Sequence, residues 1–77
     1  MDKYAQMLFE RCFQSYLMGG DIFTFNFPVE KPHIVEKYIK ALEYLVKEDF
    51  IQVVFQSEKR VRFSITEKGI DYGNKQI

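Results

Sequence analysis

Hydrophobic side chains recur with two different periods along the first third of the chain. Between residues 2 and 18 they return every three or four positions, which predicts a helix. Asp2 suits the N-cap of this helix, and Gly19-Gly20 is a stop signal. Residues 21–27 alternate with a period of two, which predicts a short strand. One face of that strand carries Phe23, Phe25 and Phe27.

The second half carries the stronger helical and strand patterns. Residues 33–48 show a clean hydrophobic stripe and predict a long helix, with Pro32 at its first turn. Residues 50–56 and 60–66 alternate and predict a hairpin around a Ser57-Glu58-Lys59 loop. The expected cross-strand pairs are Ile51 with Ile65, Val53 with Phe63, and Phe55 with Val61.

Two further elements complete the predicted fold. Thr66 is expected to cap a short C-terminal helical turn that begins near Glu67. An isolated hairpin is only marginally stable, so strand 21–27 is expected to join it in a three-stranded sheet. The segment around Pro28 and Pro32 breaks regular structure, with room for one distorted helical turn. The pattern therefore predicts one α+β domain over residues 1–77.

The first helix is hydrophobic over a wider arc than one contact requires. Phe9, Phe13 and Leu17 follow one another at steps of four, beside the stripe that contains Leu8 and Cys12. One interpretation is that the aromatic strand folds back over this line. The other is that Phe9, Phe13 and Leu17 form the interface of a homodimer.

Composition adds two constraints to this pattern. Of the 77 residues, 47% are hydrophobic and 17% aromatic, which is rich for so short a chain and favours either a ring-packed core or a covered surface. Eleven basic residues balance eleven acidic ones. A neutral net charge argues mildly against a nucleic-acid partner, although the charge on the contacting face decides whether nucleic acid binds. A net charge near zero also favours self-association.

The candidate reactive groups do not form a catalytic or metal-binding set. Cys12 is the single cysteine and lies on the hydrophobic stripe, where an inert buried thiol is the common case. His33 has no second His or Cys at ligand spacing. We expect no enzyme activity, no cofactor and no metal. With no signal peptide or membrane-length hydrophobic run, the expected setting is the cytoplasm.

Basic residues gather at two places in the predicted fold. Opposite the stripe of the long helix, a mostly basic line of five residues recurs at helical spacing, which suits a helix in a DNA major groove. Near the hairpin loop, three more basic residues are placed to reach phosphates. Glu36 and Glu43 flank the helical line and would partly neutralise it. The candidate DNA-binding residues are His33, Lys37, Lys40, Tyr44, Lys47, Lys59, Arg60 and Arg62.

The order of elements from residue 35 onward resembles the winged helix-turn-helix superfamily, in particular the MarR- and PadR-type regulators. The stretches that carry the resemblance are YIKALEYLVKEDFIQVV, KRVRFSI and ITEKGIDY. It implies a recognition helix followed by a β-hairpin wing, with Asp49 where the family tends to place Gly. The family also has a helix where residues 21–32 hold a strand and two prolines.

Two functions remain open on the sequence alone. The first is a small DNA-binding transcriptional regulator that binds double-stranded DNA, as a homodimer because one winged helix contacts only a half-site. The second is a winged-helix protein-interaction module that does not bind DNA.

Overall fold

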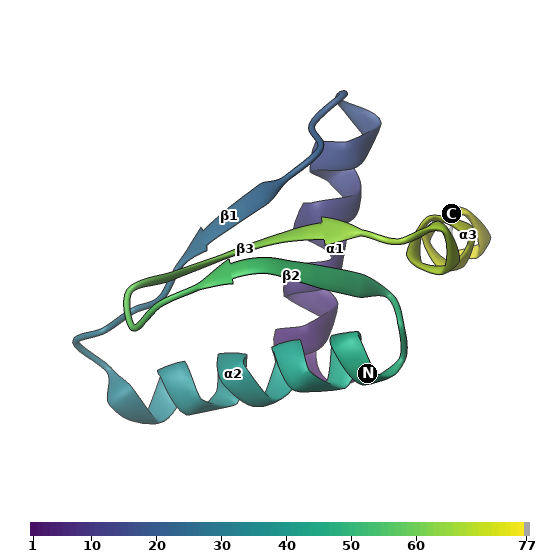
Figure 1. Cartoon of the computed structure of the whole chain (residues 1–77). Helices are drawn as coiled ribbons and strands as arrows, with labels where there is room; N and C mark the ends of the chain where they lie inside the picture. Colours follow the sequence, from purple (N-terminus) through teal and green to yellow (C-terminus); the bar gives the residue numbers. More distant parts are fainter. Residues whose placement is uncertain (77) are drawn as a thin grey trace.

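The computed structural model describes residues 1–76 and shows an α+β fold, as predicted (Figure 1). Its helices and strands agree with the predicted ones to within two residues at most ends. In chain order they are α1 (Lys3–Leu17), β1 (Phe23–Asn26), α2 (Pro32–Lys47), β2 (Ile51–Gln56), β3 (Arg60–Ile65) and α3 (Glu67–Lys75). Between β1 and α2 the chain forms a turn, in which the amide of Lys31 donates to the carbonyl of Pro28.

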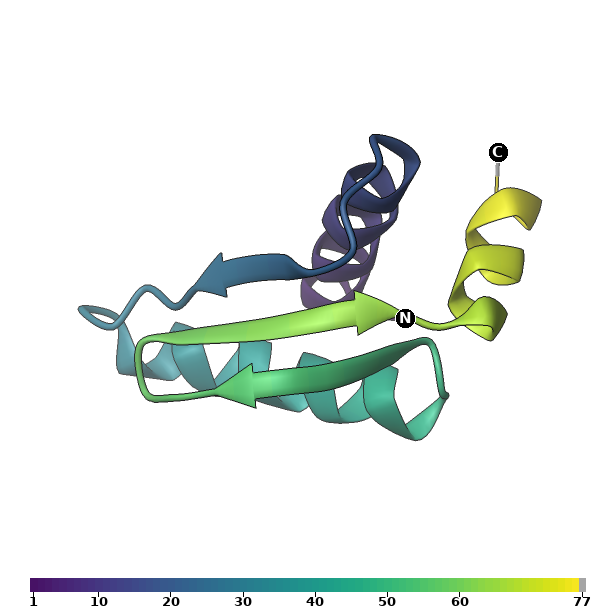
Figure 2. The ribbon, with the colours of Figure 1, turned by 45° about the horizontal axis from the view of Figure 1, so that its top comes forward.

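The three strands form one antiparallel sheet in the order β1-β3-β2, which confirms that the aromatic strand joins the hairpin. β1 pairs with the central strand β3, and Phe23 lies opposite Phe63. Figure 2 shows the sheet in front of α1 and α2, with α3 beyond one end of the strands. No described element lies over the other face of the sheet. That face is therefore open to solvent, as one face of an antiparallel sheet commonly is.

Short polar signals set the ends of the helices. The Asp2 carboxylate accepts a hydrogen bond from the Ala5 amide at 2.8 Å and caps α1, as predicted. Gly19 follows α1 with φ of +93°, a conformation that suits glycine. Asp49 follows α2 with φ of +62°, which is the left-handed position expected there. Thr66 caps α3 by accepting from the Gly69 amide at 3.0 Å.

The core lies between the sheet and the two long helices. The inward side chains of β3 meet α1 and α2, and Val61 and Phe63 are fully buried. Leu8 of α1 and Leu45 of α2 are equally inaccessible to water. Tyr4 of α1 packs edge-to-face on Tyr38 of α2, with ring centroids 5.1 Å apart. One continuous hydrophobic cluster therefore joins both halves of the chain.

A β-bulge in β2 makes one predicted pair wrong. Ile51 pairs with Ile65 and Val53 with Phe63, as expected, but the register shifts between Val53 and Phe55. Phe55 then lies opposite Arg62 instead of Val61. The extra residue reverses the alternation beyond the bulge, so the Phe55 ring lies on the open face and remains 49% exposed.

The wide hydrophobic arc of α1 is covered mainly from within the chain. Phe9 packs against Tyr72 of α3 at 5.3 Å between ring centroids and against Phe50 at 5.8 Å. Phe9 and Phe13 are only 4% and 5% exposed, so the single chain leaves little of either ring for the predicted dimer contact. The strand expected to cover them does not do so alone. The helix α3 has nine residues, longer than the short turn expected, and supplies much of the cover.

Candidate nucleic-acid interface

The solvent face of α2 carries the five helical residues predicted to contact DNA. The apolar stripe of α2 buries Ala41, Leu42 and Leu45, so the opposite side of the helix turns to water. All five predicted residues are exposed: His33, Lys37, Lys40, Tyr44 and Lys47. A helix that presents three lysines and a tyrosine in one row offers donors for phosphates and for base edges.

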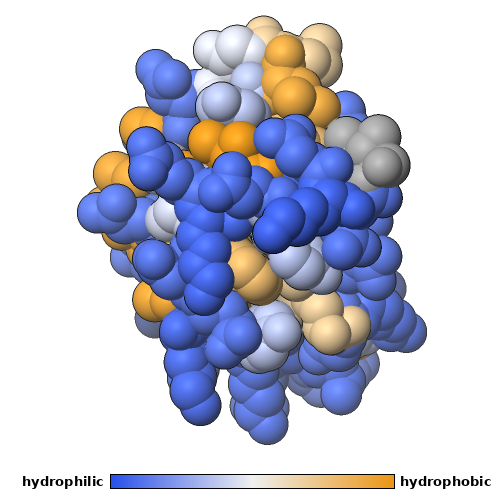
Figure 3. Space-filling model, turned by 90° about the vertical axis from the view of Figure 1, so that its right-hand side faces the viewer, coloured by the Kyte–Doolittle hydropathy of each residue, from blue (hydrophilic) through white to orange (hydrophobic). Residues whose placement is uncertain are grey.

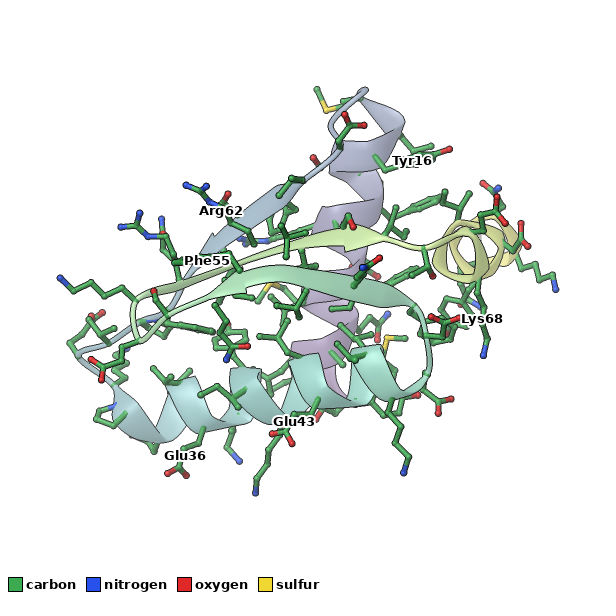
Figure 4. The ribbon with its side chains drawn as sticks, in the orientation of Figure 1. Tyr16, Glu36, Glu43, Phe55, Arg62 and Lys68 are labelled. Atoms are coloured by element: carbon green, nitrogen blue, oxygen red, sulfur yellow. The ribbon has the colours of Figure 1, made fainter. Side chains whose placement is uncertain are left out.

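Two carboxylates lie beside this basic row. Figure 4 shows Glu36 and Glu43 pointing away from the sheet below α2. Both side chains are exposed, so they share the solvent face with the lysines. Their charge reduces the positive potential along one side of the row, where Lys40 and Lys47 each follow a glutamate by four positions, and the favourable part of the face is the side that carries Lys37 and Tyr44.

The hairpin residues do not lie on that face of α2. Figure 4 shows Arg62 on the side of the sheet away from α2, and Arg60 shares that side because it is two positions earlier in β3. Lys59 lies in the β2–β3 loop, where its carbonyl accepts from the Phe27 amide at 2.8 Å. The structure therefore divides the eight predicted residues between two opposite surfaces, with Lys59 at the loop between them.

The open face of the sheet holds one row that the sequence did not reveal. Thr24 of β1, Arg62 of β3 and Phe55 of β2 are cross-strand neighbours in the observed register. The Arg62 guanidinium lies 6.0 Å from the centroid of the Phe55 ring, within the range of a cation–π contact. The alternation of β2 hid this row, because it predicted that the Phe55 ring would face the core.

An open hollow of about 1030 Å³ is lined by residues of both α1 and α3. Its floor is aromatic and its rim is polar. Among its lining residues are Phe9, Phe13, Phe23, Tyr72 and Gly73, with Gln6, Glu10 and Gln14 on the rim. Phe9 and Phe13, predicted as part of a dimer surface, thus meet solvent only along the floor of this hollow.

Hydrophobic side chains also gather where α1 ends and β1 begins. Leu17 is 52% and Met18 88% exposed, with Tyr16 and Ile22 beside them in the chain. Figure 3 views the end of the molecule that carries α3, where hydrophilic residues dominate and hydrophobic ones gather near the top. Of the predicted dimer line, only Leu17 is available to a partner.

The remaining candidate groups are a thiol and an imidazole that lie apart. Burial raises the pKa of the Cys12 thiol from its usual 9.0 to about 11, so the thiol stays protonated at neutral pH. His33 is exposed at the start of α2. Within residues 1–76, no three His, Cys, Asp or Glu side chains gather as a metal site would require.

Among the helices described, none combines the length and the apolar character needed to cross a lipid bilayer. No protein-family model, curated protein or solved structure matches the chain.

Proposed function

We propose that this protein is a small DNA-binding transcriptional regulator of winged-helix type that places α2 in the major groove. The observation that carries the proposal is the row His33, Lys37, Lys40, Tyr44 and Lys47, which is exposed along its whole length on the side of α2 away from the core. A helix of this kind can enter a major groove side-on, with lysines on phosphates or guanine and the tyrosine on the backbone or a thymine methyl.

The hairpin supports α2 in this role. In Figure 1 the β2–β3 loop lies at the same end of the molecule as the first turn of α2. The hydrogen bond from the Phe27 amide to the Lys59 carbonyl ties the loop to the segment just before that helix. We propose that Lys59 contacts a phosphate beside the groove that α2 would occupy. The order of a long helix, a hairpin and a Thr-capped helix is consistent with the winged-helix resemblance.

The experiment measures binding to duplex DNA over a range of salt concentrations. The variant Lys37→Ala/Lys40→Ala/Lys47→Ala should bind about tenfold more weakly or worse, because each lysine neutralises a phosphate. Each lost contact should also flatten the plot of log affinity against log salt by about 0.9. Circular dichroism should show an unchanged fold, since all three side chains are exposed.

A matched control changes the opposite charge on the same helix. Glu36→Gln/Glu43→Gln should bind duplex DNA more tightly, because it removes two carboxylates beside the lysines. Equal binding by the wild type and the triple lysine variant would contradict the placement of α2 in the groove. Weaker binding by the glutamine variant would contradict it as well.

A specific observation favours a second candidate function, a protein-interaction module that acts without DNA. The hydrophobic group Tyr16, Leu17, Met18 and Ile22 is exposed at one corner of the fold. Exposed apolar patches with polar rims are typical of protein interfaces. A wild type that shows no duplex binding at low salt would favour this function over the first.

A further inference from the structure

We infer that the open face of the sheet is a second binding surface, which takes single-stranded DNA by stacking a base on Phe55 and binding the adjacent phosphates through Arg60 and Arg62. This surface lies on the opposite side of the sheet from α2 (Figure 4). It is therefore separate from the face proposed to contact duplex DNA, and the two can be tested independently.

The first argument is the position of the Phe55 ring. Strict alternation would place this ring in the core, where burial of a phenylalanine stabilises the fold. The bulge between Val53 and Phe55 instead places the ring opposite Arg62 on the open face, 49% exposed. Bulges are common next to binding sites, where they redirect a side chain. An exposed ring on the open face of a sheet can stack with any base, because every base has a π-face.

The second argument is the charge of the surface. The only charged residues within the three strands are Arg60 and Arg62, and no strand residue is Asp or Glu. Because these two arginines alternate with the buried Val61 and Phe63, both guanidinium groups project from the open face. Strands that carry cations and no carboxylate favour the approach of a polyanion, and guanidinium binds phosphate through paired hydrogen bonds.

The third argument is the order of chemical groups across the sheet. One row runs from Thr24 through Arg62 to Phe55, and the adjacent row places Asn26 opposite Arg60. The hydroxyl and amide groups on β1 can hydrogen-bond a nucleotide adjacent to the one whose base stacks on the Phe55 ring. Val54 beside Phe55 is 56% exposed, an apolar neighbour that suits the thymine methyl and the deoxyribose ring.

A base inside a duplex cannot reach this surface. Its two faces are covered by its neighbours in the stack, so the Phe55 ring can engage only a base that is unpaired. This requirement selects a single strand over a duplex.

The experiment uses fluorescence anisotropy with a labelled oligothymidylate of about ten nucleotides, a length within the range that small single-strand-binding folds cover. Wild type should bind, and Phe55→Leu, which keeps the apolar character without a ring, should bind about five-fold to about a hundred-fold more weakly. Phe55→Tyr should bind like the wild type. Arg62→Ala should weaken binding and flatten the salt slope by about 0.7, the value for one phosphate of a single strand.

The controls separate this surface from α2 and from general damage. Lys37→Ala/Lys40→Ala/Lys47→Ala should leave oligothymidylate binding within about twofold, because those lysines lie on the far side of the sheet. Thermal unfolding of Phe55→Leu should match the wild type, because the ring is half exposed. Loss of duplex binding in the triple lysine variant with oligothymidylate binding intact supports two separate surfaces.

Three results would overturn the inference. Equal affinity of Phe55→Leu and the wild type for oligothymidylate would show that stacking on the Phe55 ring does not contribute to binding. Binding of oligouridylate without oligothymidylate would assign the surface to RNA. Absence of oligothymidylate binding at low salt, while duplex binding persists, would refute this surface and leave the function proposed for α2 standing.

Discussion

At the scale of single residues, the two glycines of α3 explain how this short helix approaches the rest of the fold. A Cβ on Gly69 would overlap the main-chain carbonyl of Phe50 and come within 2.7 Å of Cγ1 of Ile65. A Cβ on Gly73 would lie 2.5 Å from the Phe13 ring. Both glycines are buried, and neither needs an unusual backbone conformation. Glycine is therefore required here for close packing and not for its flexibility.

We predict that Gly69→Ala lowers the free energy of unfolding by about 1–2 kcal/mol. Alanine normally stabilises a helix relative to glycine by about 1 kcal/mol. A lower free energy of unfolding in Gly69→Ala would therefore result from the clash of the new Cβ with the Phe50 carbonyl. Urea unfolding measures the change. The control is Asn74→Ala, at an exposed position of the same helix, which should be neutral or stabilising. Equal stabilisation by both variants would show that α3 does not pack as closely as described.

At the scale of elements, Thr66 joins three parts of the fold. Its hydroxyl donates to the carbonyl of Asp49, just before β2, and accepts from the Gly69 amide in α3. Its own amide donates to the Phe50 carbonyl at 3.1 Å. One side chain therefore caps α3 and holds the end of β3 against the start of β2, which fixes the angle at which α3 leaves the sheet.

We predict that Thr66→Val lowers the free energy of unfolding by about 1–2 kcal/mol, because the isosteric side chain can neither cap α3 nor bond Asp49. Thr66→Ser keeps the hydroxyl and should stay within about 0.5 kcal/mol of the wild type. Thermal and urea unfolding of the three proteins provide the comparison. A serine variant as unstable as the valine variant would show that the hydroxyl alone does not account for the stabilisation, because serine keeps the hydroxyl group.

Local signals predicted the elements, but not every contact between them. Asp2, Thr66 and the glycines after α1 mark helix ends through chemistry that is legible in the sequence, and the pairs Ile51–Ile65 and Val53–Phe63 follow from alternation. The bulge before Phe55 was missed because one inserted residue leaves the hydrophobic pattern of β2 unchanged. The open-face row was missed with it, since that row exists only in the shifted register.

At the scale of the whole molecule, the fold presents two surfaces of different character on opposite sides of one sheet. The α2 face is a line of lysines with carboxylates beside it, and the open sheet face carries two arginines and a ring. The chain as a whole is neutral, so long-range attraction to a polyanion is weak, and local charge governs any such binding. The exposed corner at Leu17 and Met18 is a third surface, and its apolar character suits a second copy of the chain.

We predict that the wild type forms a dimer at high micromolar concentration through this corner, and that Leu17→Glu is a folded monomer. A buried carboxylate in an apolar contact is strongly unfavourable, whereas Leu17 is half exposed in the single chain, so its replacement should spare the fold. Sedimentation velocity measures both states. Gln56→Glu adds the same charge beside the β2–β3 loop and should remain dimeric.

A second variant tests whether Phe13 of α1 belongs to the core of a single chain. Phe13→Glu should unfold the protein instead of merely dissociating it, because Phe13 is buried against α3 within one chain. A folded, monomeric Phe13→Glu protein would restore the original interpretation of that line. A wild type that stays monomeric at every concentration would contradict the dimer.

The position of β3 between β1 and β2 has a consequence for folding during synthesis of the protein. β3 is the last strand in the chain, and β1 and β2 each pair with it and not with each other. As the chain leaves the ribosome from its N-terminus, both earlier strands remain unpaired until residues 60–65 emerge. A chain stopped before those residues would form no part of this sheet. Assembly of the sheet is thus delayed until nearly all of the described chain has been made.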